Sequence, residues 1–199
     1  MLGLPKTTEL SKQLPKNAIY AKFQMNTAEK AKIDADISRI TIVNEVSADK
    51  VHIAVGEQVK SFFVLLVALK KKDFDDKTII TISKLIPQNM LLVLECGDEA
   101  KLATYHTKLM QTEWKRKEEL SVELKGVNLD TVWENIIIQI GGITVDKGNT
   151  LDEQIAVDEQ RRKIQKEIDR LTKQAKNEKQ PKKKFELVQK INGLKKELM

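Results

Sequence analysis

The 199-residue sequence predicts an α+β protein. A mixed, mainly antiparallel sheet of about five strands with interleaved helices is expected first, followed by a C-terminal antiparallel helical hairpin in a coiled coil. The run SFFVLLVAL at Ser61–Leu69 has no polar residue after its first position, which is typical of a central strand buried on both faces. Helical and strand patterns alternate around this run, and coiled-coil spacing replaces them near residue 149. We therefore predict an α+β domain over 1–148 and a basic helical hairpin over 149–199.

The elements before the central run are predicted from prolines, caps and β-branched residues. Residues 1–25 contain Pro5 and Pro15, so we expect an irregular lead-in with one short element of undecided type at 18–23. Asn26 or Thr27 can cap the helix that follows. The sequence then predicts one helix and two strands, over residues 28–37, 39–46 and 50–55.

Helical spacing decides the first element after the central run. The apolar positions of residues 77–86 recur as in a helix, although their Thr and Ile content favours a strand. Asp75 or Asp76 can cap this helix, and Pro87 ends it. The rest of the domain is predicted as three strands, the first two joined by the hairpin turn CGDEA, and a helix capped by Asn128 and ended by Gly141-Gly142, with the strands at 90–96, 101–110 and 117–124.

The tail is predicted as two helices that pack against each other. Thr150 and Glu153 form a capping box, and the helix it opens runs without Gly or Pro to about Lys179. Pro181 breaks this helix and suits the first turn of the next one. Apolar residues recur four and three positions apart in both segments, with Arg161 at the missing step: Val157, Ile164, Ile168, Leu171, Ala175, Leu187, Ile191, Leu194 and Leu198. The short break predicts an antiparallel hairpin.

The basic character of the chain belongs to this tail. Residues 150–199 carry 14 Lys and Arg against 9 Asp and Glu, which is +5 of the chain's net +6. Six lysines gather at the expected hairpin tip: Lys173, Lys176, Lys179, Lys182, Lys183 and Lys184. They are candidate nucleic-acid-binding residues that would contact phosphates independently of sequence. The alternative is a solvated, lysine-rich helical face, and no aromatic residues other than Phe185 lie nearby for base stacking.

No pattern in the sequence demands an active site. His52 and His106 fall within predicted strands, and their spacing does not suggest a shared metal. Cys96 has no evident base beside it and is interpreted as a structural strand cysteine. The 8 glycines are scattered, and neither GxxxxGK nor GxGxxG occurs. We therefore expect no cofactor, no metal site and no catalytic residues.

One stretch keeps an enzymatic alternative open. Asp98, Glu99 and Lys101 place an acid and a lysine two positions apart beside a strand, an arrangement that can hold Mg²⁺ and orient a water in a nuclease. The same residue types are expected in the hairpin turn predicted here, and no acid on a neighbouring strand is identifiable. The alternative to a non-enzymatic protein is therefore an enzyme, a metal-dependent nuclease.

The cysteine and hydropathy patterns predict a cytoplasmic protein. Cys96 is the only cysteine, so no intrachain disulfide can form, which suits a reducing compartment. The N-terminal residues resemble neither a signal peptide nor a transit peptide. No stretch approaches the roughly 20 apolar residues that cross a bilayer, so no membrane association is expected.

Five segments resemble a known family. They are GLPKTTELSKQLPKNAIYAKF, KLIPQNMLLVLE, YHTKLMQTEW, NLDTVWENII and, in the tail, EQIAVDEQR. The chain resembles an uncharacterised family of bacterial and archaeal proteins known only as a domain of unknown function. Members of that family are often encoded beside helicases and adenine methyltransferases resembling type III restriction–modification systems. The resemblance implies an accessory role in DNA processing or phage defence, and it supplies no catalytic residues.

These observations lead to one expected function and two alternatives. The expected protein is a non-enzymatic accessory subunit that docks on a helicase or DNA methyltransferase and touches the DNA backbone through its basic hairpin. The nuclease is the first alternative. The second is a structural homodimer held by the hairpin, because Arg161 in the apolar seam indicates imperfect closure of the hairpin on itself.

Overall fold

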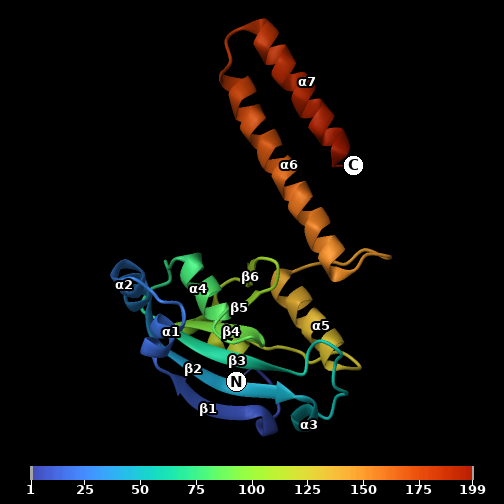
Figure 1. Cartoon of the computed structure of the whole chain (residues 1–199). Helices are drawn as coiled ribbons and strands as arrows, with labels where there is room; N and C mark the ends of the chain where they lie inside the picture. The colour runs from blue at the N-terminus through green and yellow to red at the C-terminus, as the bar shows by residue number, and fades with distance from the viewer. Residues whose placement is uncertain (1, 199) are drawn as a thin grey trace. The chain divides into compact units, whose positions relative to one another are not determined.

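The structure is a computed structural model, and it describes residues 2–198. The apolar run Ser61–Leu69 forms strand β3, which lies inside the sheet (Figure 1). β3 pairs antiparallel with β2 (Ile37–Ser47) and parallel with β4 (Asn89–Cys96). Every residue of β3 is buried or half-buried. The prediction of a central strand covered on both faces is confirmed, and it fits the continuous apolar composition of the run.

The sheet has seven strands, where the sequence predicted about five. Their spatial order is β1-β2-β3-β4-β5-β6, and β7 pairs with β5 beside β6. All neighbours are antiparallel except β3 and β4, which are joined through helix α4. The remaining strands are β1 (Glu9–Leu14), β5 (Glu99–Tyr105), β6 (Leu109–Gln111) and β7 (Lys115–Arg116). The predicted α+β fold with a mixed, mainly antiparallel sheet is confirmed.

Helices cover both faces of this sheet. On one face α1 (Lys16–Lys22), α2 (Thr27–Asp36) and α4 (Asp76–Ser83) contribute isoleucines to a cluster that also contains Leu65 of β3. On the other face the Phe62 ring lies 5.1 Å from the Trp133 ring of α5 (Leu129–Gly141). Three short helices complete the part of the chain before Ile143: η1 (Lys6–Thr8), α3 (Ala48–Val51) and η2 (Lys117–Glu119).

A bulge in β2 lets this strand contribute to both apolar layers. Ile40 and Ile42 pair with Val67 and Leu65 and join the cluster beneath α1, α2 and α4. The register shifts after Ile42, so that the buried Val46 pairs with Phe62 on the α5 side. One extra residue therefore moves the even-numbered side chains of β2 from one face to the other.

The predicted helix caps are present. Asn26, Asp75, Asn128 and Thr150 each accept a hydrogen bond from a backbone N–H two or three residues further along. Each cap satisfies one of the N–H groups that a helix leaves without an intrahelical partner. The predicted helices at 28–37 and 128–141 are confirmed within a residue, and the helix predicted at 77–86 ends earlier, at Ser83.

The prediction of a strand at residues 50–55 is wrong. Residues Ala48–Val51 form the short helix α3, and His52 has a left-handed backbone with φ of 55°. Only Ala54 makes a bridge, to Asn128. The helical turn of α3 and the left-handed backbone of His52 interrupt the extended conformation that a strand requires.

Two further strand predictions need correction. Residues 101–110 divide into β5 and β6, because a turn in which the His106 N–H donates to the Lys108 carbonyl reverses the chain. Residues 117–124 form η2 and an extended piece with one bridge, between Ser121 and Leu2, although Leu120 and Val122 are buried as expected. Residues 2–25, for which the sequence predicts only one short element, contain η1, β1 and α1.

The chain divides into two compact units, one up to Ile143 and the other from Thr144 onward. The second unit is the predicted helical hairpin, formed by α6 (Leu151–Asn177) and α7 (Pro181–Glu197). Its buried cluster consists of Ile168, Leu171, Ala175 and Ile191, with Ile164, Leu187, Leu194 and Leu198 packed around it. This is the seam expected from the heptad spacing, apart from its first position, Val157.

No helix within residues 2–198 is long and apolar enough to cross a membrane.

Asp130, in the first turn of α5, holds the loop that leads into β3. Its carboxylate accepts N–H bonds from Glu57 at 2.7 Å, Gln58 at 3.2 Å and Val59 at 2.7 Å. These three N–H donors lower the pKa of Asp130 from its ordinary value, and the bond from Val59 has the largest effect. Gly56 completes the contact, because a Cβ at this position would overlap the Asp130 side chain.

We expect Asp130→Asn to lower the thermal midpoint of the protein at pH 7, since the amide keeps only one acceptor oxygen for the three donors. The pKa of Asp130 is depressed by folding, so the carboxylate contributes stability above its unfolded pKa, and this contribution is lost as pH falls through the lower folded pKa. Thermal melts from pH 7 downward should show the variant and the wild type converging below about pH 4. A constant difference across this range would contradict the assignment.

Ile191→Ala should destabilise the hairpin by about 2–4 kcal/mol, because Ile191 is a buried member of its small core. Gln189→Ala, on the exposed side of α7, is the control and should change little. Helix-sensitive circular dichroism during heating measures both. Equal effects of the two substitutions would mean that the seam does not hold the hairpin together.

Candidate nucleic-acid interface at the hairpin tip

The hairpin tip is a tight connection between α6 and α7. The Glu178 N–H donates to the Gln174 carbonyl at 2.9 Å, and the Glu178 side chain accepts from the Gln180 N–H at 2.9 Å. Pro181 then occupies the first turn of α7, where its missing N–H costs no hydrogen bond. The chain therefore reverses within three residues, and the lysines on both sides of the turn come together.

All six predicted lysines lie at or beside this turn. Lys173 and Lys176 are on the last turns of α6, Lys179 is in the connection, and Lys182, Lys183 and Lys184 are on the first turn of α7. Each of the six is exposed, and none forms an ion pair with a carboxylate of the described residues. The tip thus presents cations that no internal partner neutralises.

The helix dipoles act differently on the two groups of lysines. Lys176 lies in the last turn of α6, where a cation interacts favourably with the helix carbonyls. Lys182 and Lys183 lie in the first turn of α7, which contains no acidic residue and receives no side-chain cap. Their charges meet the positive end of the helix dipole, so this turn is less stable than one that starts with acids. Such a local cost is typical of a functional position.

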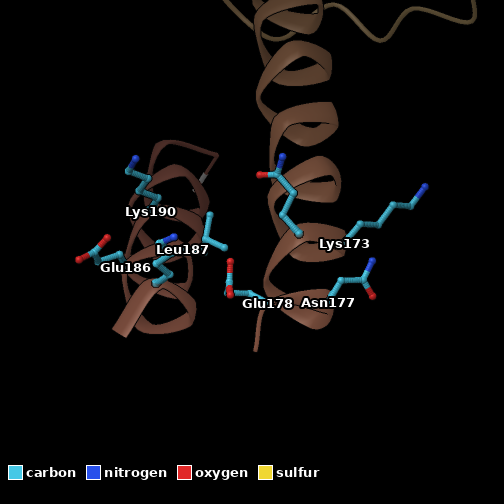
Figure 2. A pocket seen from close by; sticks show the side chains of 8 residues that line it. Lys173, Asn177, Glu178, Glu186, Leu187 and Lys190 are labelled. Atoms are coloured by element: carbon cyan, nitrogen blue, oxygen red, sulfur yellow. The ribbon is translucent and has the colours of Figure 1, made fainter. Parts of the chain in front are cut away.

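A groove of about 630 Å³ runs between the two helices next to the tip (Figure 2). Figure 2 shows Leu187 pointing from α7 toward α6, whereas Lys173 points away from α7. The groove is lined by lysine, glutamate and amide side chains together: Lys173, Gln174, Asn177, Glu178, Lys183, Glu186, Leu187 and Lys190. Glu178 and Glu186 lie among the lysines, so the groove itself is of mixed charge. Lys190 is not among the lysines predicted from the sequence, because it lies beyond the lysine run.

The histidines and the cysteine are not brought together. His52 follows α3, His106 is in the turn between β5 and β6, and the half-buried Cys96 ends β4. No three His, Cys, Asp or Glu side chains within residues 2–198 are arranged to hold a metal ion.

Glu99 and Lys101, the residues of the nuclease alternative, have other partners. Glu99 forms an ion pair with Lys72. The Lys101 ammonium lies 4.7 Å from the centre of the Phe74 ring and 5.2 Å from that of Trp114. Burial lowers the pKa of Lys101, and the charges of Asp76 and Glu113 partly oppose this shift. Nothing in the sequence indicated this cage, because Phe74 and Trp114 come from separate loops.

A family described as a domain of unknown function, DUF4391, matches residues 2–198, which is nearly the whole chain. The chain belongs to the DUF4391 family. The resemblance noted from the sequence is therefore confirmed, and the DUF4391 match includes the hairpin as well as the α+β unit. No curated protein and no solved structure matches the chain.

We expect Lys182 and Lys183 to lower the stability of the hairpin, because they meet the positive end of the α7 dipole. Replacing Lys182 and Lys183 together by Glu should stabilise the hairpin by about 0.3–1 kcal/mol for each reversed charge and so raise its thermal midpoint. Lys195→Glu with Lys196→Glu, in the last turn of α7, changes the net charge equally and should lower the midpoint. Helix-sensitive circular dichroism at low salt compares the two variants. A shift of the same sign in both would show that net charge, and not helix position, sets the effect.

Proposed function

We propose that this DUF4391 member is a non-enzymatic accessory protein of a DNA-processing or phage-defence system. In this proposal the protein docks on a helicase or DNA methyltransferase subunit, and its hairpin tip contacts DNA phosphates. The observation that carries the proposal is the set of exposed, unpaired lysines on both sides of the Glu178–Gln180 turn. The choice of partner rests on the family resemblance, which implies a restriction–modification setting.

Electrostatics supports phosphate contact in two ways. Lysines that meet phosphates release condensed counterions from the nucleic acid, which favours binding at low salt. An anion beside the first turn of α7 would also relieve the unfavourable interaction of Lys182 and Lys183 with the helix dipole. The helix α6 has 27 residues and is about 40 Å long, so the tip is carried well away from the base of the hairpin.

The proposal places the protein in the cytoplasm. Its single cysteine, Cys96, allows no intrachain disulfide, which suits a reducing compartment. Helicases and DNA methyltransferases act in the same compartment as the DNA. The phosphate contacts would be independent of base sequence, so specificity would come from the docked partner.

Duplex-DNA binding measured by fluorescence anisotropy over a salt series tests the tip. The wild type should lose affinity steeply as salt rises, and replacing Lys179, Lys182, Lys183 and Lys184 by Gln should flatten the dependence. Each phosphate contact removed lowers the slope of log K against log salt by about 0.9. We therefore expect the slope to fall by about 2–4 in the four-lysine variant.

The matched control replaces four exposed lysines of the first unit, Lys6, Lys12, Lys77 and Lys115, by Gln. This variant has the same net charge and should bind as the wild type does. No binding at low salt, or equal weakening in both variants, would refute the role of the tip. DNA cleavage that requires a divalent metal and is lost in Glu99→Ala would instead support the nuclease alternative.

A further inference from the structure

The charges of α6 are separated along the helix. Its first ten residues, 151–160, contain four acids and no Lys or Arg: Asp152, Glu153, Asp158 and Glu159. The tip, residues 173–184, contains the six lysines and only one acid, Glu178. Acids in a first helical turn complement the helix dipole, but that effect fades within the turn. Asp158 and Glu159 lie beyond it. Asp158 accepts a hydrogen bond from the Gln154 amide at 3.0 Å, and Glu159 lies 3.4 Å from Lys163. This pair is exposed, so it contributes little and leaves Glu159 able to interact with cations of a partner.

The acidic base of α6, residues 151–160, is also where the apolar seam has no covering helix. The core between α6 and α7 begins at Ile164 and extends to Ala175. Val157 continues the same seam toward the base but is 37% exposed. Arg161, the next seam position, is exposed as well. The seam therefore continues past the part of α6 that α7 covers.

The tip has exposed apolar residues that the hairpin does not use. Phe185 is 62% exposed and Val188 is 40% exposed, and both lie on α7 one turn apart. Neither belongs to the cluster between the helices. The base is therefore acidic with an exposed apolar residue, and the tip is basic with two exposed apolar residues. Their charges are opposite, and each end has apolar surface to bury.

We propose that two copies of this chain associate through their hairpins in antiparallel orientation, the tip of one on the base of the other. A two-fold axis forms both contacts at once, because the same two surfaces meet twice. Val157 of each copy would pack against Phe185 and Val188 of the other, and the tip lysines would face Asp158 and Glu159. The result is an antiparallel four-helix arrangement.

One hairpin cannot make this contact within itself. Val157 and Asn177 are 20 residues apart on a single helix, which is about 30 Å along its axis, and Phe185 follows the turn after Asn177. A base-to-tip contact must therefore come from a second copy. The association does not depend on the proposed DNA contact. If both occur, they compete for the same lysines, so self-association would hide the DNA-binding tip until the partner or DNA displaces it.

Disulfide trapping tests the geometry in the full chain without DNA. In a Cys96→Ser background, Val157→Cys combined with Phe185→Cys should give a covalent dimer under mild oxidation, seen on a non-reducing gel. Arg162→Cys combined with Phe185→Cys is the matched control, because Arg162 lies on the side of α6 away from the seam. The control should give much less dimer. Equal trapping in both pairs would overturn the proposed arrangement.

Charge exchange tests the attraction. Asp158→Lys with Glu159→Lys should weaken dimerisation about tenfold or more in light scattering, and adding Lys182→Glu with Lys183→Glu should restore it, because both surfaces then have reversed charges. Circular dichroism checks that each variant remains helical. A protein that stays monomeric in light scattering at tens of micromolar refutes the proposal, whatever its affinity for DNA.

Discussion

The first unit depends on burying β3 on both faces. An apolar strand with neighbours on both edges has to be covered from above and below, and one layer of helices cannot do this. The fold meets the requirement with α1, α2 and α4 on one face and α5 on the other. The β2 bulge allows the neighbouring strand to supply apolar side chains to both layers. Asp130 then ties the α5 layer to the loop that enters β3.

The hairpin follows a different principle. Its core is a single row of aliphatic residues between two helices, and most of its remaining surface is charged. With so few apolar contacts, helix caps, dipole interactions and charge placement have a larger relative influence on its stability. Lysines in the first turn of α7 reduce that stability, and a ligand or surface of opposite charge would offset this cost. Both proposals made above supply one, as DNA phosphate or as the acidic base of a second copy.

Much of this structure could be predicted from the sequence, because caps and apolar spacing are local signals. Asn128, Thr150 and the seam around Ile191 are each recognisable within a few residues. The strand β1 could not be predicted, because its exposed polar residues, ELSKQL, contribute backbone hydrogen bonds and almost no buried surface.

Local alternation predicts a strand at residues 50–55, but it does not reveal that the chain turns there through α3 and the left-handed His52. In the candidate site, the sequence located the lysines, since clustering in sequence suffices when a tight turn joins two helices. The groove beside them and the aromatic surroundings of Lys101 depend on contacts between distant segments, which no local pattern encodes.

The bridges that close the first unit have a consequence for its synthesis on the ribosome. Leu2 pairs with Ser121, and Ala54 pairs with Asn128, so the ends of the unit meet only after most of it has been made. Contacts of this sequence separation form slowly, whereas the contacts between α6 and α7, such as those in the cluster of Ile168 and Ile191, close much shorter stretches of chain and form faster. The hairpin is translated after the first unit and yet needs less time to fold. The nascent sheet, with β3 still incompletely covered, is therefore the species that chaperones would meet.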